Sequence, residues 1–472
     1  MMDEEKLEKK SVGEGIFQVV IANAVNLVIS LVSGFVIPRY LSIDAYANYK
    51  TFILFTSYCG LLHFGFVDGI YLKYGGKEYG DIDVNEFLIQ QKVLLIMQFT
   101  VSCIGTIVSS ILSNDYLLLA FMCALPTNML MLYKFVFQAT GKFGEYRKIV
   151  NLQALMTFVY NMFALLIMRI DDARIYCAGH IIINIFIMMY FYIITHMQIR
   201  EKVRCNISTT FSMMKDMILS GAALMLGNFA VLWIANIDRW FVKAFCGNAE
   251  FAYYSFAVSM LKTVNVVLGA FAIALYNYFC QKKDIQIIAS ARKKIMIIGA
   301  IAIAIAFPLE FCVTLLLPKY VMAEDVMMVL IAAQLPLVVI NAVYVNIFKA
   351  KGMQREYLYS LVIVSVFAIL LDFLFGKIFG YYMVSYVYAT FITMIFWLLL
   401  CQLMLPDYRM KQSELIYMIL VSGVYRACML INPILGFLIY ILIIGLLSKI
   451  FFKTEVNDFF TILVRKFGKR II

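Results

Sequence analysis

Apolar runs of about twenty residues follow one another along the whole chain, separated by short polar stretches. A helix needs about twenty apolar residues to cross the hydrocarbon core of a bilayer, which is about 30 Å thick. The pattern therefore predicts an all-α, polytopic membrane protein with about fourteen transmembrane helices. We place the spans at roughly 15–37, 47–69, 88–112, 116–138, 150–169, 175–196, 217–237, 251–279, 295–317, 325–348, 357–376, 381–405, 414–431 and 434–452.

Composition agrees with this class and narrows the partners. Of the 472 residues 63% are hydrophobic, and the mean hydropathy is +0.87, whereas a soluble globule is about half apolar. The net charge of +11 invites a nucleic-acid interpretation, but the Lys and Arg residues cluster on alternate sides of the apolar runs. That distribution follows the positive-inside rule, so membrane lipids are expected partners and nucleic acid is not. The ten cysteines are scattered, with no CxxC motif and no pairing with histidine, and indicate no metal site.

The charge distribution also predicts orientation. Loops on the N-terminal side of the membrane hold about 27 Lys and Arg residues, against about 7 in the opposite loops. Both termini are therefore expected in the cytoplasm. The outer loops are all short, which excludes an extracytoplasmic domain.

A phrase at the end of the fourth span recurs at the end of the tenth. Phe137-x-Ala139-x-Gly141-x-x-x-Glu145-Tyr146 is repeated as Phe348-x-Ala350-x-Gly352-x-x-x-Glu356-Tyr357, and Tyr46-Ala47-Asn48-Tyr49 is similar to Phe251-Ala252-Tyr253-Tyr254. Six spans separate the copies, an even number, so the two halves are parallel repeats, unless the similarity arose by chance. The predicted organisation is an N-terminal six-helix lobe at 1–216, a C-terminal six-helix lobe at 217–405, and two additional helices with a basic tail at 406–472.

Polar residues within the spans are the candidate binding residues, because a charge in lipid is costly and normally faces a protein interior or a hydrated cavity. Lys262 lies near the middle of the eighth span, and polar or small side chains share its helical face. They are Ser255, Ser259, Asn265, Gly269, Tyr276 and Asn277. This stripe predicts a cavity lined by a cation; the alternative is a lysine paired with an acidic residue for stability alone.

The first and seventh spans carry similar stripes. Asn23, Asn26, Ser30 and Ser33 share one face of the first span, and Gly221, Asn228 and Arg239 align in the seventh, with Asp238 beside Arg239. The repeat offset places Asn23 opposite Asn228. We expect the first, seventh and eighth spans to line a shared cleft, although Asn and Ser also hydrogen-bond between membrane helices without any ligand.

The remaining intramembrane charges have other expected roles. Glu310, just after Pro308 in the ninth span, is placed either to carry a proton in a coupling cycle or to neutralise a cation. Asp68 and Asp372 lie near span ends and are expected to be solvated. Arg39, Lys50, Lys134 and Arg426 are expected to extend to the interface.

No enzyme signature is present. The chain has no Walker A loop and no HExxH, and its three histidines are too dispersed for a metal site. Any transport would draw on an ion gradient (H⁺ or Na⁺), on the membrane potential or on consumption of the product, with no cofactor.

Several short motifs, in order along most of the chain, resemble the Wzx-type O-antigen and capsule repeat-unit flippases of the MOP exporter superfamily. The motifs are Ile37-Pro38-Arg39-Tyr40-Leu41-Ser42, Phe64-Gly65-Phe66-Val67-Asp68-Gly69-Ile70, Ile237-Asp238-Arg239-Trp240 and Leu317-Pro318-Lys319-Tyr320. The chain departs from the family pattern where Tyr46-Ala47-Asn48-Tyr49 lacks an expected glycine.

The resemblance implies two six-helix lobes in a V-shaped, MATE-like arrangement that alternates between inward-open and outward-open states. It implies a flippase that moves undecaprenyl-pyrophosphate-linked oligosaccharides across the bacterial inner membrane for O-antigen, capsule or exopolysaccharide synthesis. A polysaccharide polymerase and a chain-length regulator are the partners it suggests. Lys262 and Arg239 would attract the anionic head group, Asn and Ser side chains would contact sugar hydroxyls, and Tyr276 would stack on a sugar ring.

Three alternatives stay open. A MATE-like cation or drug antiporter would favour a carboxylate-lined cavity, which the first span does not supply. A membrane enzyme of polysaccharide assembly would need larger outer loops. A lipid II flippase shares the fold and is compatible with the sequence.

Overall fold

The structure, a computed structural model, describes residues 27–197, 207–281 and 284–458. All regular secondary structure over these residues is helical, and all fourteen predicted spans fall on helices there, the first only in part. Among the described residues, ten helices are long and apolar enough to cross a membrane, or eleven if a bent pair over Ile43–His63 and Phe66–Tyr74 is one span. The predicted all-α, multi-pass membrane fold is thus confirmed.

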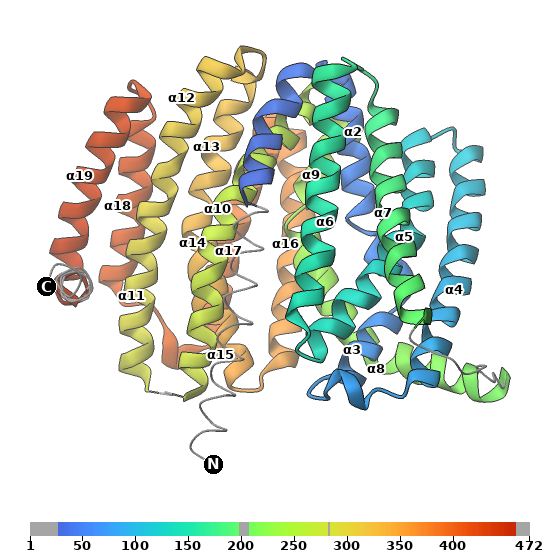
Figure 1. Cartoon of the computed structure of the whole chain (residues 1–472). Coiled ribbons are helices and arrows are strands. Elements are labelled where there is room, and N and C mark those ends of the chain that lie inside the picture. The colour runs from blue at the N-terminus through green and yellow to red at the C-terminus, as the bar shows by residue number, and fades with distance from the viewer. Residues whose placement is uncertain (1–26, 198–206, 282–283, 459–472) are drawn as a thin grey trace, which may run out of the picture. The chain divides into compact units, whose positions relative to one another are not determined.

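The chain divides into two compact units, residues 1–232 and 233–472, which we describe separately. In the first unit a helix over Leu27–Tyr40 precedes the numbered helices (Figure 1). They are α2 (Ile43–Thr56), the 3₁₀ turn η1 (Cys59–His63), α3 (Phe66–Tyr74), α4 (Val84–Ile111), α5 (Asp115–Ala139), α6 (Phe143–Met162), the π-helical η3 (Phe163–Ile167), α7 (Ala173–Met197) and α8 (Ile207–Ile234).

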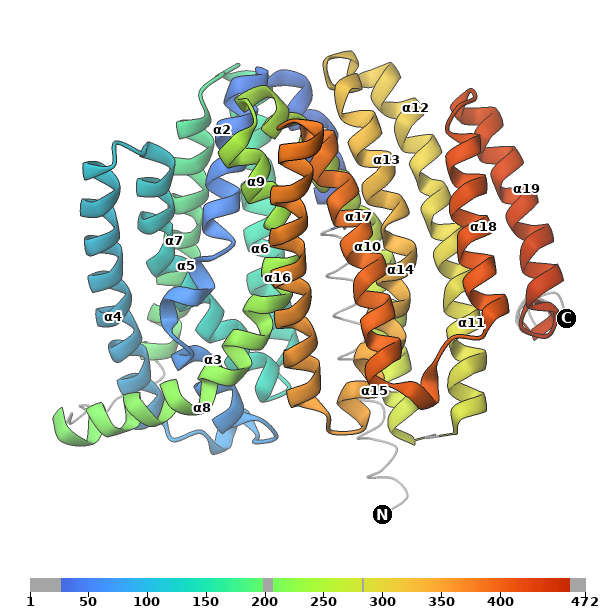
Figure 2. The same ribbon diagram turned by 180° about the vertical axis from the view of Figure 1, so that it is seen from behind.

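The first unit is organised around α5. Helices α2, α3, α4, α6 and α7 all pack on it, and buried side chains of α3, α4, α5 and α7 form one apolar core. Several helices begin where the sequence supplies a cap: Ser42 accepts a hydrogen bond from Ala45 N at 3.2 Å, and Asn114 accepts one from Leu117 N at 3.0 Å. The first turns of α8 run across the ends of neighbouring helices and not alongside them (Figures 1 and 2).

The second unit is also built of helices over its described residues. It contains α9 (Ile237–Phe245), α10 (Asn248–Gln281), α11 (Ile285–Ala302), α12 (Ala306–Leu316), α13 (Glu324–Ala332), α14 (Gln334–Val339), the π-helical η6 (Ile340–Tyr344), α15 (Val345–Ala350), α16 (Gln354–Phe379), α17 (Met383–Met404), α18 (Gln412–Cys428) and α19 (Pro433–Phe451). Helices α16 and α17 pack as a pair, and α18 and α19 form a second pair that packs on α11 and α12 (Figure 2).

The repeated phrase adopts the same local structure in both units. Gly141 after α5 and Gly352 after α15 have left-handed backbones, with φ of 71° and 72°, which glycine tolerates because it has no Cβ. Tyr133 and Tyr344, one turn before each phrase, are 1% and 0% exposed. The domain boundaries predicted at 216/217 and 405/406 rest on this repeat and stay a prediction.

Candidate functional site

A buried polar cluster lies in the second unit where α9, α10, α16 and α17 meet. Asp238 of α9 is 4% exposed and accepts hydrogen bonds from the hydroxyls of Tyr254 and Thr390, the latter at 3.0 Å. The backbone N–H of Arg239 donates to its other oxygen at 2.7 Å. Three donors therefore hold this carboxylate, which is what a buried charge requires.

A second carboxylate faces this cluster. Asp372 of α16 is buried, at 2% exposure, and lies close enough to Asp238 for the two groups to repel each other when both are ionised. The expectation that Asp372 is solvated is wrong. The helix places it away from the span end and toward α9, an orientation that a position in the sequence does not reveal.

Arg239 follows Asp238 and is also buried, at 3% exposure. Its Nη1 donates to Asn236 Oδ1 at 3.0 Å. The side chain is near enough to Lys262 for the two cations to repel each other. Arg239 and Lys262 were both predicted as cationic binding residues, and the structure places their side chains close to each other.

Lys262 lies about midway along the 34 residues of α10. Its side chain is exposed, and no carboxylate lies within ion-pair distance of it in the described part of the chain. Ser255, seven residues nearer the start of α10, is by contrast packed inside the unit at 1% exposure. Ser259 is half-buried and donates to Ser255 O at 2.7 Å. The predicted stripe thus runs from the interior of the unit to an exposed lysine.

The other candidate residues are dispersed or not described. Ser30 is exposed on the helix over Leu27–Tyr40, and Asn228 is exposed on α8. Glu310 is half-buried on α12, close enough to Glu324 and Asp325 to be repelled by both. Asn23 and Asn26 lie outside the described residues, as do the side chains of Asn265 and Tyr276, although the α10 helix includes both positions.

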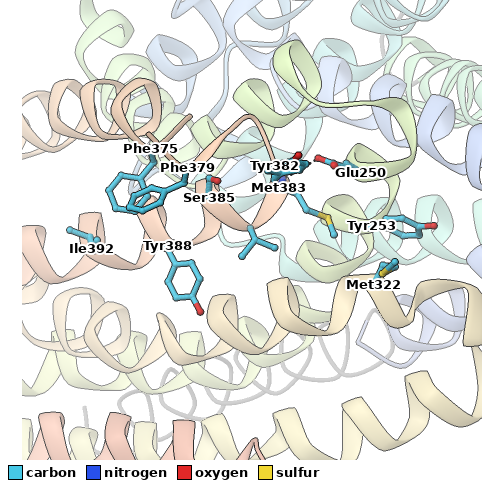
Figure 3. A pocket seen from close by; sticks show the side chains of 11 residues that line it. Glu250, Tyr253, Met322, Phe375, Phe379, Tyr382, Met383, Ser385, Tyr388 and Ile392 are labelled. Atoms are coloured by element: carbon cyan, nitrogen blue, oxygen red, sulfur yellow. Dashed lines mark hydrogen bonds between the residues drawn. The ribbon is translucent and has the colours of Figure 1, made fainter. Parts of the chain in front are cut away.

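A cavity that the sequence did not predict lies near the first turns of α10. It has a volume of about 730 Å³ and is walled by α10, α16 and α17 (Figure 3). Its lining is mostly aromatic and aliphatic: Glu250, Tyr253, Met322, Phe375, Phe379, Tyr382, Met383, Val384, Ser385, Tyr388 and Ile392. The one carboxylate, Glu250, is already engaged, because Met383 N donates to its Oε2 at 3.1 Å.

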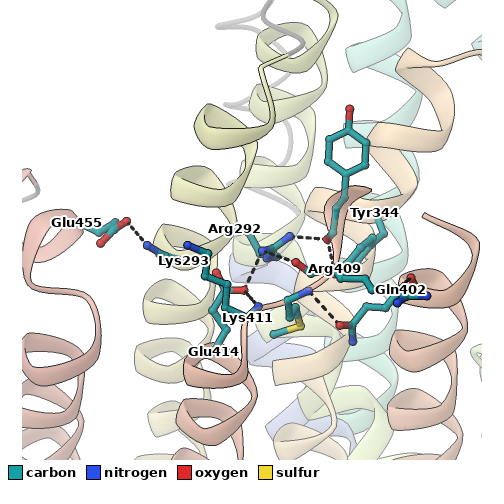
Figure 4. A network of polar contacts seen from close by, with 10 residues as sticks. Arg292, Lys293, Tyr344, Gln402, Arg409, Lys411, Glu414 and Glu455 are labelled. Carbon is teal, nitrogen blue, oxygen red and sulfur yellow. Dashed lines mark hydrogen bonds and ion pairs between the residues drawn. The ribbon is translucent and has the colours of Figure 1, made fainter. Parts of the chain in front are cut away.

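A polar network joins the last two spans to the rest of the second unit (Figure 4). Arg292 of α11 donates to Glu414 of α18 at 2.8 Å and to the carbonyl oxygen of Tyr408 at 2.7 Å. Next to it, Lys293 pairs with Glu455 at 3.0 Å. These two basic residues therefore tie α11 to α18 and to the segment that follows α19.

The first unit contains a break in its second span, at a motif that the sequence singled out. Helix α3 is bent by 63° from the preceding α2–η1 segment, and the buried side chains of His63 and Asp68 meet across the break. Asp68 is 1% exposed, so the expectation that it is solvated is also wrong. No group of three or more His, Cys, Asp or Glu residues suited to a metal ion occurs among the described residues.

No protein-family model and no curated protein sequence matches the chain. Among solved structures, the chain is similar to the lipid II flippase MurJ in an inward closed conformation, with a TM-score of 0.66 and 15% identity over 94% of this chain and 99% of that one. It is also similar to an inward-facing multidrug-resistance MATE family transporter of the MOP superfamily, with a TM-score of 0.52 and 13% identity over 82% of this chain and 98% of that one. At these identities the likeness shows the fold, and that fold is the one shared by MurJ and MATE transporters.

Proposed function

We propose that this protein is a flippase for undecaprenyl-pyrophosphate-linked oligosaccharides, which it moves across the bacterial inner membrane by alternating access. The oligosaccharides would be repeat units of a surface polysaccharide. The fold supports a transporter, since it is similar to the solved structures of a lipid II flippase and of a MATE family transporter. The sequence motifs that resemble Wzx-type flippases support the cargo.

One observation carries the choice of an anionic cargo, namely the exposed Lys262 in the middle of α10, which has no carboxylate partner among the described residues. A lysine at that depth would be costly against acyl chains, so it is expected to face a hydrated space. Arg239 adds a second positive charge to the same region. Because this space would lie within the low-dielectric membrane interior, these cations would attract a pyrophosphate more strongly than they do in bulk water, and they would repel the organic cations of a drug antiporter.

We further propose that an ion gradient drives the cycle through Asp238. The carboxylates of Asp238 and Asp372 and the hydroxyl of Thr390 supply oxygen donors in a buried place. Two adjacent carboxylates cannot both stay ionised cheaply, so uptake of H⁺ or Na⁺ would relieve their repulsion. Glu310 is the second candidate for coupling.

A lipid II flippase is the second candidate function, favoured by the similarity to MurJ. Both cargoes carry an anionic lipid-linked head, so Lys262 serves either. Deletion in the native bacterium separates them: loss of surface polysaccharide in viable cells supports the oligosaccharide, and loss of viability with lipid II accumulation supports the alternative.

The test of the anionic-cargo site is Lys262→Ala. We expect surface polysaccharide to fall about tenfold or more, as the loss of about 1.4 kcal/mol of binding energy would produce, with lipid-linked oligosaccharide accumulating on the cytoplasmic side. Lys262→Arg should retain most of the activity. Lys449→Ala, which removes an exposed lysine from the last turn of α19, is the matched control. Normal polysaccharide at normal protein level in Lys262→Ala would remove Lys262 from the mechanism.

A further inference from the structure

The second span is broken, and its counterpart in the other unit is not. Phe64 and Gly65 have φ of 53° and 85° and end the 3₁₀ turn before α3 begins. At the offset that relates the two repeats, α10 runs on as one helix from Asn248 to Gln281. An interrupted spanning helix frees backbone groups, and in transporters such interruptions occur where ions or substrates bind. This difference between the broken second span and the continuous α10 therefore indicates a role for the first unit that the second unit does not share.

Neighbouring helices hold the break in place. Gln98 of α4 donates to the carbonyl oxygen of Leu62 at 2.8 Å. Asn128 of α5 donates to the carbonyl oxygen of Cys59 at 2.9 Å and to Gln98 Oε1 at 2.7 Å. Both amides are fully buried, so these bonds replace those that a continuous helix would have made. The break is therefore stabilised by specific hydrogen bonds within the first unit.

The break brings together a buried histidine and a buried carboxylate. His63 is 0% exposed, and its Nε2 lies 3.5 Å from Asp68 Oδ2. Gly65 N donates to His63 Nδ1 at 3.1 Å, so that nitrogen carries no proton and the ring proton is on Nε2. Nε2 lies beside the Asp68 carboxylate but has no partner of good hydrogen-bond geometry among the described residues. In this arrangement the imidazole is neutral and supplies a donor without a positive charge.

The other groups around Asp68 are uncharged. Asn228 of α8 also lies close to the carboxylate, and α4 and α5 present the amides of Gln98 and Asn128 to the break. Neither oxygen of Asp68 has a partner of good hydrogen-bond geometry within the described ranges. Among those residues His63 is the one basic side chain within ion-pair distance of Asp68. An ionised carboxylate in such a place is costly, and proton uptake removes the cost.

We propose that Asp68 is a proton-binding site, in which His63 and Asn228 hold the carboxyl group in both protonation states. When the group is ionised, it accepts from His63 Nε2–H and from the amide N–H of Asn228. When it takes up a proton, its O–H donates to the amide oxygen of Asn228, which has turned over, and its second oxygen still accepts from His63. An amide suits this position because it offers both a donor and an acceptor.

The site acts directly on α8 through Asn228. Close by, α8 crosses α3 with backbone against backbone, since a Cβ built on Gly221 would lie 2.0 Å from the carbonyl oxygen of Gly65. Helix α8 ends the first unit and leads into the second. Protonation of Asp68 thus changes a hydrogen bond to the one helix that connects the two units. This site is additional to the coupling cluster at Asp238 and does not depend on the identity of the cargo.

The experiment is a pH titration of the full-length protein in lipid nanodiscs, followed by infrared difference spectroscopy of the carboxylic-acid carbonyl stretch. We expect a band that grows on acidification and is lost in Asp68→Asn. Asp372→Asn, which removes another buried carboxylate, should leave that band in place. His63→Leu removes one donor to the carboxylate and should raise the titration midpoint of the band by about one pH unit or more.

Two results would overturn the proposal. One is an Asp68→Asn spectrum identical to that of the unsubstituted protein. The other is an unchanged midpoint in His63→Leu, which would leave the pair a merely structural role. Size-exclusion profiles check that each variant is folded, and if Asp68→Asn is not, Asp68→Glu should keep the band at a shifted frequency. Because no cargo is added, a negative result here leaves the proposed flippase function standing.

Discussion

Single buried charges in this chain depend on their partners. Arg292 and Glu414 are 2% and 0% exposed and form an ion pair at 2.8 Å. Glu414 also accepts a hydrogen bond from Lys411 N at 2.9 Å, which caps α18. Removing one partner of a buried pair leaves an uncompensated charge, and this costs more than the pair itself contributes.

We therefore expect Glu414→Gln to destabilise the protein by about 3 kcal/mol, seen as a lower midpoint of thermal unfolding in detergent. Glu145→Gln, which breaks the exposed pair with Lys148, should change stability by less than about 1 kcal/mol. An equal effect of the two substitutions would show that the buried pair is not anchoring α18.

For single residues, the sequence predicted which charged side chains stand out within the spans better than it predicted whether those side chains are buried. It selected Lys262, Arg239 and Asp238 because a charge inside an apolar run stands out. It placed Asp68 and Asp372 in solvent because they lie near span ends, yet both are buried. Their burial depends on which helix packs against them, α8 and α9, and that is a long-range fact. The aromatic cavity beside Glu250 was missed for the same reason, since its walls come from separate segments.

The helices themselves could be predicted well, because the length of an apolar run is a local property that a bilayer selects. The break between Thr56 and Phe66 was not predicted, although Gly65 and Gly69 lay within a motif that the sequence singled out. The role of these two glycines becomes apparent only from how closely α3 packs against α8. A Cβ built on Gly69 would lie 2.0 Å from the carbonyl oxygen of Met217 on α8. Small residues four apart allow membrane helices to approach this closely.

Gly69→Ala should accordingly disturb the crossing of α3 and α8. The contact is with backbone, which cannot move aside like a flexible side chain, so we expect at least the 1–3 kcal/mol typical of overpacking and a reduced yield of monodisperse protein. Gly423→Ala is the control, because a Cβ there meets nothing within 4 Å in α18. If both alanine variants gave the same yield and the same midpoint of thermal unfolding, the close crossing of α3 and α8 would not contribute to stability.

For the molecule as a whole, orientation is the property that the sequence predicts from charge alone. About 27 Lys and Arg residues fall on one side of the predicted spans and about 7 on the other, which predicts that both termini lie in the cytoplasm. The two ends of α19 offer a direct test. Leu430 is exposed in the turn before α19, and Lys453 is exposed just after it. The 19 residues between Pro433 and Phe451 span about 28 Å as a helix, enough to cross the hydrocarbon core.

We expect a membrane-impermeant maleimide to label Leu430→Cys in intact inner-membrane spheroplasts and to leave Lys453→Cys unlabelled until the membrane is permeabilised. The unsubstituted protein, with its ten native cysteines, sets the background. The reverse pattern would invert the predicted topology. Labelling of both positions in intact spheroplasts would mean that α19 does not cross the bilayer, and the fourteen-span count would have to be reduced.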